Sequence, residues 1–181
     1  MKKLMFICVL LALALCSLGC VDDAFGHEIF TDINDYSKVF ELPEIRFREV
    51  LELFPEKAES LNTKDFYFEW ELGIVGSAKI ELSLSVEYNE KELNEEITRL
   101  KSLSDGKTVY DTEIFEYPAY VVCLGNHQTS CYALIDGGVV HYVYVSLIYK
   151  SDMNINRKFL PKGYSQSGQV TGQSYNIYWE E

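Results

Sequence analysis

Three residues with metal-binding or disulfide chemistry lie at even spacing in the second half of the chain: Cys123, His127 and Cys131, in the order C-x3-H-x3-C. Thiolate and imidazole are zinc ligands, but a structural zinc site takes four ligands at better-defined spacings. The chain offers no CxxC pair and no HExxH motif to complete such a site. We therefore predict neither a metal nor another cofactor here.

The same two cysteines lie on either side of a predicted turn at residues 125–128. In an antiparallel hairpin, opposite residues bring their Cβ atoms within about 4.5–5.5 Å, close to what a disulfide uses. A loop this small would gain roughly 2–3 kcal/mol from the crosslink in the chain-entropy model. We predict a disulfide between Cys123 and Cys131. The alternative is two reduced cysteines in the core, where this residue type is common.

Nucleophilic catalysis by a cysteine would need a histidine base and an orienting Asn or Asp. His141, Asn126 and Asp136 lie nearby in sequence, but a histidine on an apolar strand is typical of a satisfied core residue, and any strand-rich chain supplies such a set. The sequence has neither a GxSxG elbow nor a Walker loop. We predict no catalytic residue.

Paired carboxylates are the other candidate chemistry, since Glu69 shares a predicted strand face with Glu71, and Glu81 shares one with Glu87. Two carboxylates about 5–9.5 Å apart can act as acid and base in glycoside hydrolysis. Residues i and i+2 of every strand have about that spacing, so the pattern favours a solvated sheet face. An exported hydrolase that uses these carboxylates is kept as an alternative.

Tyrosine is the one abundant polar aromatic residue of the predicted strands. Side chains of this type favour half-wet interfaces, so a tyrosine-rich face could bind a glycan or a partner protein. Cross-strand packing is the more usual role of tyrosine in a sheet. The residues concerned are Tyr110, Tyr117, Tyr120, Tyr132, Tyr142, Tyr144 and Tyr149.

The elements that must position these residues begin with helices. Thr31 or Asp32 can cap a short helix that ends before Pro43, and this proline suits the first turn of a second helix. Alternation with period two then predicts a β-hairpin of residues 66–72 and 80–86, with one dry face and one wet face. The second helix has its apolar face at Phe47, Val50, Leu51 and Phe54.

A third helix is predicted from the capping box of Asn89 and Glu92 to Asp105-Gly106. The strands that follow form a meander, and the last of them is apolar on both faces, so it should lie in the middle of the sheet. The expected fold class is α+β, a mostly antiparallel sheet with N-terminal and central helices packed on one face. The later strands are expected at 107–116, 120–124, 131–135 and 139–149, with a loop from Ser151 and an edge strand at 175–179.

The N-terminus has the form of an export signal. Lys2 and Lys3 precede an apolar run over 4–15 that is too short to span a bilayer. Residues 17–20, Ser-Leu-Gly-Cys, resemble the lipobox of bacterial lipoproteins. The resemblance implies cleavage before Cys20, a diacylglyceryl group on its thiol, and acyl chains such as palmitate that anchor the protein to a membrane. Residues 17–19 also fit an ordinary signal-peptidase site, which would leave a secreted protein.

The expected organisation is a signal peptide at 1–19, a lipidated cysteine and tether at 20–30, and one α+β domain at 31–181. The full chain has a net charge of -12, and loss of the leader would leave 14 of its 16 basic residues against all 28 acidic ones, a net charge of -14. Such a chain repels nucleic acid, so DNA or RNA binding is disfavoured.

Together these features favour a cell-envelope lipoprotein on the extracytoplasmic face of the membrane, with a non-catalytic binding or structural domain. An envelope protein or a glycan is the partner we expect, besides the membrane itself. An exported hydrolase is one alternative. A secreted inhibitor or immunity-type protein that opposes a basic enzyme is the other, because an acidic field attracts basic partners.

Overall fold

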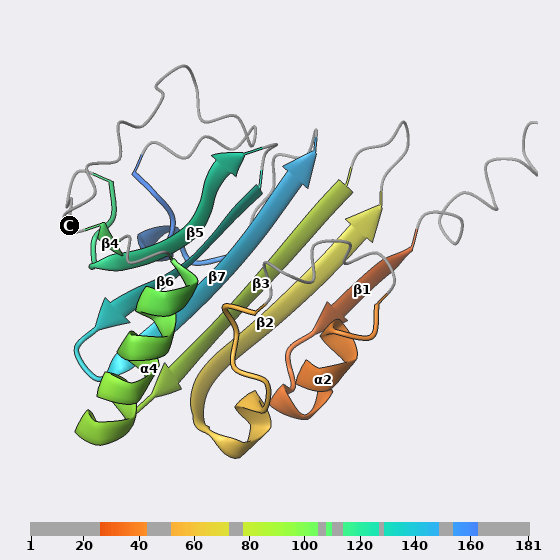
Figure 1. Cartoon of the computed structure of the whole chain (residues 1–181). Coiled ribbons are helices and arrows are strands. Elements are labelled where there is room, and N and C mark those ends of the chain that lie inside the picture. The colour runs from red at the N-terminus through yellow and green to blue at the C-terminus, as the bar shows by residue number, and fades with distance from the viewer. Residues whose placement is uncertain are drawn as a thin grey trace, which may run out of the picture.

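The structure is a computed structural model that describes residues 26–42, 52–72, 78–104, 108–109, 114–126, 129–148 and 154–162. In these ranges seven strands form one antiparallel sheet, in the order β1-β2-β3-β7-β6-β5-β4 (Figure 1). The expected α+β class with a mostly antiparallel sheet is confirmed. The strands are β1 His27–Phe30, β2 Asn62–Leu72, β3 Ala78–Glu87, β4 Thr108–Val109, β5 Ala119–Asn126, β6 Thr129–Asp136 and β7 Val139–Ile148.

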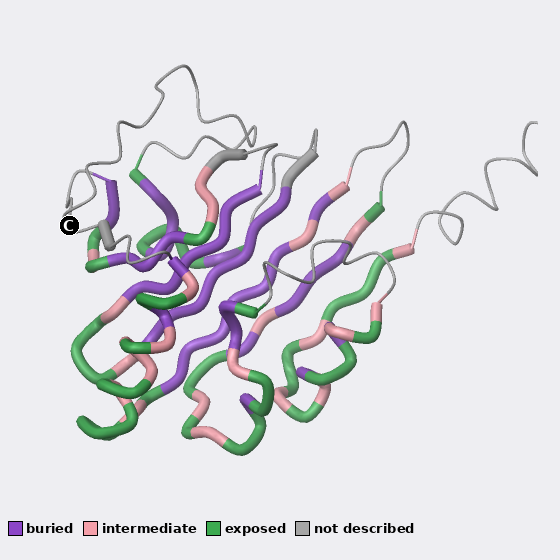
Figure 2. The backbone as a smooth tube through the Cα atoms, in the orientation of Figure 1, coloured by how far each residue is buried: buried purple, intermediate pink, exposed green. Residues whose placement is uncertain are grey.

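The sheet consists of a hairpin and a meander that meet at a single seam. β2 pairs with β3, while β4, β5, β6 and β7 follow one another, and β7 returns beside β3 with His141 opposite Ser85. This places β7 at the centre of the sheet, as its two-sided apolar pattern predicts. Residues 140–146 are all buried, and Figure 2 shows the buried backbone concentrated in these middle strands.

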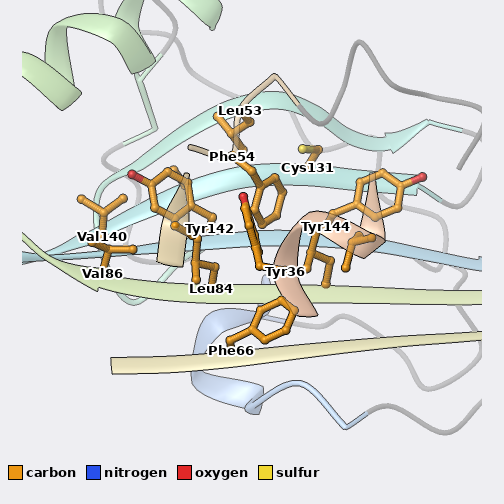
Figure 3. Packing of buried hydrophobic residues seen from close by; sticks show 14 of the residues in the cluster. Tyr36, Leu53, Phe54, Phe66, Leu84, Val86, Cys131, Val140, Tyr142 and Tyr144 are labelled. Carbon is orange, nitrogen blue, oxygen red and sulfur yellow. The ribbon is translucent and has the colours of Figure 1, made fainter. Parts of the chain in front are cut away.

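Both faces of the sheet carry a hydrophobic cluster, because successive side chains of a strand point to opposite sides. We call the two sides face A and face B. On face A, seen in part in Figure 3, the cluster includes Tyr36, Val39, Phe54, Leu84, Leu100, Tyr142 and Tyr144. On face B the cluster includes Phe115, Tyr132, Val143, Val145, Ile155, Phe159 and Leu160.

The expectation of one wet face on the β2–β3 hairpin is wrong for β3. On face B, Lys79 and Glu81 are only 3% and 0% exposed. Their cover is the segment 154–162, expected to be a loop, whose Asn154 and Ile155 backbone N–H groups donate to Glu81. Periodicity reports where polar residues lie along a strand, but not what a distant segment places over them.

The sheet begins earlier in the chain than expected. His27–Phe30, at the end of the expected tether, forms β1 and pairs antiparallel with β2. Just before it, Gly26 has a φ of 62° and lies so close to the ring of Trp70 that an added Cβ would come within 2.3 Å. Gly26 is therefore required both by the backbone conformation and by the packing.

One longer helix and several short ones connect the strands: η2 Ile33–Asp35, α2 Tyr36–Val39, η3 Ala58–Ser60, α4 Glu90–Leu103 and η5 Arg157–Phe159. Asp32 caps η2, which confirms the predicted start of the first helix. The capping box of α4 is also confirmed, since Asn89 and Glu92 each accept a hydrogen bond from the other's backbone N–H, at 3.0 and 3.1 Å. The predicted second helix lies outside the described residues over 43–51, and its expected last residues, 52–54, form a turn instead of a helix. The predictions for 105–106 and 175–179 also lie outside the described residues.

Candidate functional site

A cavity of about 860 Å³ lies between α4 and residues 52–61. The end of α2 and Tyr88, which follows β3, complete its walls. Its volume falls within the roughly 300–1,000 Å³ typical of ligand sites. A smaller hollow of about 480 Å³ lies between residues 31–33 and 63–66. We take the larger cavity as the candidate functional site.

The large cavity has an apolar floor and an acidic rim. Its apolar lining consists of Phe40, Phe54, Pro55, Leu61 and Tyr88. Its acidic lining consists of Glu52, Glu56, Glu92, Glu95 and Glu96. Ser37 and Arg99 complete the described lining, so five carboxylates face one guanidinium. This arrangement suits a ligand with positive charge and an apolar part.

A chain of hydrogen bonds fixes the inner end of the cavity. The Tyr142 hydroxyl donates to Glu96 at 2.6 Å and lies 2.8 Å from the Tyr88 hydroxyl. Burial and the nearby Glu96 raise the pKa of Tyr142, and burial raises the pKa of Tyr88 to about 12. Both phenols are therefore neutral at physiological pH, and they hold the Glu96 carboxylate in one orientation.

Arg99 ties α4 to the opposite wall. Its guanidinium donates to the backbone carbonyls of Glu52 at 2.8 Å and Leu53 at 2.6 Å, and to the Glu96 side chain at 2.8 Å. Burial opposes the charge of Arg99, but the hydrogen bonds and charge of Glu96 outweigh it and raise the pKa. Arg99 is thus committed to Glu96 and the wall, and its described hydrogen bonds reach none of the other four rim carboxylates.

A second polar cluster is buried on face B, under residues 154–162. Lys79 Nζ lies 2.7 Å from Glu69 Oε2 and 3.4 Å from Glu81 Oε1. The Asn154 side chain donates to Glu69 at 2.7 Å, and its backbone N–H donates to Glu81 at 2.8 Å. The Tyr67 hydroxyl also donates to Glu69, at 2.6 Å. The solvated face expected for Glu69 and Glu81 is therefore wrong.

The pKa values of the two buried carboxylates are shifted in opposite directions. Burial opposes the charge of Glu69, but hydrogen bonds from Lys79, Tyr67 and Asn154 outweigh it and hold the pKa at about 2. Burial dominates at Glu81 and raises its pKa despite the same lysine. Such a split is the pattern of an acid–base pair. However, the side chains are only 7% and 0% exposed, and neither lines either of the two described cavities.

The other two glutamates of the predicted pairs lie at opposite ends of the hairpin, and Glu71 is opposite Lys79 in the β2–β3 register. Glu71 is half-buried toward the end of β2. Glu87 is exposed at the far end of β3, where its carboxylate lies 2.7 Å from Lys64 Nζ. Of the four strand glutamates, Glu69 and Glu81 thus form a buried pair at Lys79, whereas Glu87 pairs with Lys64.

His141 has a serine partner that the sequence did not indicate. Ser85 Oγ lies 2.8 Å from His141 Nδ1, and Asp136 Oδ2 lies 3.8 Å from Nε2. The ring of Phe159 stacks on the imidazole at 4.1 Å, and burial lowers the pKa of His141. Cys131 belongs to the cluster on the opposite face, so the set is a covered core histidine and has no cysteine nucleophile.

Cys123 lies directly opposite Cys131 in the β5–β6 register, as predicted. The structure carries both side chains as thiols. Cys131 is completely buried, Cys123 Sγ lies 3.9 Å from the Thr129 carbonyl oxygen, and burial raises the pKa of both thiols. The disulfide stays a prediction, supported by a register that brings the two strands' cysteines face to face.

The remaining predicted positions are not described. Cys20, the leader at 1–19, Tyr110, His127 and Tyr149 lie outside the described residues. In the part of the chain that is described, no helix is long and apolar enough to cross a membrane. The same ranges hold no group of three or more His, Cys, Asp or Glu side chains placed to bind a metal ion.

Exposed tyrosines do not form the candidate site. Tyr132, Tyr142 and Tyr144 are at most 1% exposed, so these side chains belong to the core and form no exposed binding face. The cavity residues were missed because the glutamates of α4 lie outside its apolar stripe and resemble an ordinary solvated helix face. The spacing of Glu92, Glu95, Glu96 and Arg99 on one side of the helix was the available signal.

Comparison with known proteins adds no family to this picture. No protein-family model, curated protein or solved structure matches the chain. The fold defines the class as an α+β domain with a single antiparallel sheet. The cavity, its charge and its packing are therefore the basis for assigning a function.

Proposed function

We propose that this chain is a cell-envelope lipoprotein whose α+β domain binds a ligand and has no catalytic role. One observation carries the binding role: a ligand-sized cavity of about 860 Å³ that combines an apolar floor with an acidic rim. In this proposal α2, α4 and residues 52–61 cover face A and form the cavity walls. Two observations support this: Figure 1 draws both helices on the same side of the sheet, and Val39 of α2 and Leu100 of α4 belong to the same hydrophobic cluster.

A binding role is favoured over hydrolysis by where the carboxylates lie. A carboxylate enzyme needs two acids that converge in an open pocket, one of them with a raised pKa. Glu69 and Glu81 converge, but Asn154 closes over them. The glutamates of the cavity are open to a ligand, yet they line its rim around an apolar floor, as in a recognition site.

In this proposal Cys20 anchors the domain to the extracytoplasmic face of the membrane. The test is mass spectrometry of the membrane fraction from cells that express the wild type or Cys20→Ala. We expect a diacylglyceryl-modified N-terminus and membrane location for the wild type, and loss of both in the variant. Cys16→Ala, four residues earlier, is the matched control and should behave as wild type. The anchor would be refuted if the wild-type protein were found outside the membrane fraction and lacked the diacylglyceryl mass.

The binding role is tested without knowledge of the ligand. A library of small uncharged and charged fragments is screened by NMR against the processed full chain in detergent. Fragments that bind should shift the amide signals of α4 and residues 52–61 together. Ser37→Trp, which places an indole at an exposed position of the lining, should abolish these shifts. A screen with no hits, or with hits that cluster elsewhere on the sheet, would contradict a binding role for the cavity.

A further inference from the structure

The charge of the cavity defines its ligand more closely. Glu52, Glu56, Glu92 and Glu95 are exposed at the rim, and the only basic residue among the described lining residues is Arg99. Each described donor of that guanidinium bonds to Glu96 or to a backbone carbonyl. Glu92 also accepts from the Asn89 backbone N–H, and Glu95 lies 3.7 Å from Lys91 Nζ. All four carboxylates are nevertheless exposed to a cationic ligand, in a chain whose net charge of -12 already draws cations toward it.

The floor adds a second requirement. Phe40, Phe54 and Tyr88 bring aromatic side chains to the cavity, and Leu61 and Pro55 complete its apolar lining. An aromatic floor binds the apolar stem of a lysine or arginine side chain, or an adjacent apolar side chain, and its rings attract the cationic head. The lining itself contains one guanidinium paired with a carboxylate, since Arg99 donates to Glu96, which also accepts from Tyr142.

The positions of the rim carboxylates favour a basic polypeptide over a small cation as the ligand. Glu92 and Glu95 lie on one side of the cavity along α4, and Glu52 and Glu56 come from the segment opposite. A single organic cation could meet one of these groups of glutamates. A ligand with several positive charges can meet both groups, and a basic polypeptide supplies them, because residues on a helix face or along a strand repeat every ~6–7 Å.

We propose that this cavity binds a basic segment of a partner protein, with Lys or Arg heads at the rim glutamates and an apolar side chain on the aromatic floor. The inference rests on the proposed function and adds the chemistry of the partner. It fits a domain that holds or blocks a basic protein in the envelope. Anionic membrane surfaces and nucleic acids are repelled by the same charges.

The test measures binding of a fluorescent peptide of alternating Lys and Phe residues to the processed full chain in detergent. We expect saturable binding that weakens as salt rises. The double variant Glu92→Gln/Glu95→Gln keeps the capping interaction of α4, because Gln also serves in a capping box. It should weaken binding about tenfold, the effect of losing two partly solvated charge contacts.

The matched control is Glu59→Gln/Glu90→Gln, which removes the same charge from exposed glutamates outside the cavity lining. It should leave the affinity within about twofold of wild type, because charges outside the contact contribute little after screening. Equal weakening in both double variants would show general attraction to an acidic chain and overturn the inference. Circular dichroism on each variant excludes loss of folding as the cause.

Two further arms separate the possible failures. In the first arm the probe is tetramethylammonium. If it binds the cavity and the peptide does not, the ligand is a small cation, and the proposal of a basic protein segment is overturned. In the second arm the probes are uncharged fragments. If they bind the cavity while neither the peptide nor tetramethylammonium binds, the inference is also overturned, but the proposed binding function stands. Fragments and cationic probes that all fail to bind would refute both.

Discussion

The buried lysine of face B provides a stringent test of how this sheet is held together. Replacing Lys79 by Met keeps a chain of similar length and removes the ammonium group that lies between Glu69 and Glu81. These two carboxylates are opposite each other in the β2–β3 register. The variant would leave them buried with no charge between them, and we expect a large loss of stability.

The size of the loss follows from desolvation. Removing one partner of a buried ion pair costs about 3–5 kcal/mol, because the charge left behind stays out of water. Domains of this size are stable by about 5–15 kcal/mol, so Lys79→Met should still fold but with a much smaller margin. With a urea dependence of about 2 kcal/mol per molar, the unfolding midpoint should fall by roughly 2 M.

Mildly acidic pH should reduce the loss of stability caused by Lys79→Met. In the wild type the pKa of Glu69 is about 2, below the value of 4.5 for an ordinary glutamate, so its stabilisation is complete above pH 4.5 and is lost as the pH falls toward 2. Without the lysine, burial raises the pKa of both carboxylates. The folded variant then takes up protons more readily than the unfolded chain. Urea unfolding should show a smaller gap from wild type at pH 5 than at pH 7.

A neutral version of the whole cluster is the control. The triple variant Glu69→Gln/Lys79→Met/Glu81→Gln removes all three charges and keeps an oxygen that can accept from the backbone N–H of Asn154. Because uncharged replacements of buried ion pairs are often close to neutral, it should recover most of the lost stability. The reasoning would be refuted if the unfolding free energy of Lys79→Met were within about 0.5 kcal/mol of wild type. It would also be refuted if the difference in stability between this variant and wild type were larger at pH 5 than at pH 7.

Three other predictions follow from local geometry. Gly26→Ala should destabilise the protein by about 1–3 kcal/mol in urea unfolding, since the new Cβ would meet the Trp70 ring at a positive φ; wild-type stability would show that β1 shifts freely. Asn89→Ala should cost about 1 kcal/mol through loss of the helix cap, and Asn89→Ser should restore most of it. Intact-mass measurement of the exported protein after alkylation in denaturant should find Cys123 and Cys131 joined and unlabelled, while two alkylated thiols there would exclude the disulfide.

The strands were predictable because their signal is local. Alternation along 66–72 and 80–86 identified β2 and β3, and the two-sided apolar run from Val139 identified the central strand. Capping chemistry at Asn89 fixed the start of α4 equally well. In each case the side chains that define the element are a few residues apart, so the physics that forms it can be read in one window of sequence.

The two polar sites could not be predicted in the same way. Glu81 looks solvated until residues 154–162 cover it, and that contact joins positions more than seventy residues apart. The cavity depends likewise on the distance between α4 and residues 52–61, which Arg99 bridges through bonds to backbone carbonyls. A charged residue in a sequence window gives no sign of which remote backbone it will bond.

The central place of β7 governs the order in which this sheet can be completed. Val139–Ile148 follows every other described strand in the chain, yet it fills the gap between β3 and β6. Until it emerges, both of those strands present open edges, which readily pair with other chains, and long-range pairing of this kind is slow. A partly synthesised chain that lacks β7 thus consists of two unfinished half-sheets. We expect a chaperone that shields β3 to speed its maturation more than one that acts on either outer strand.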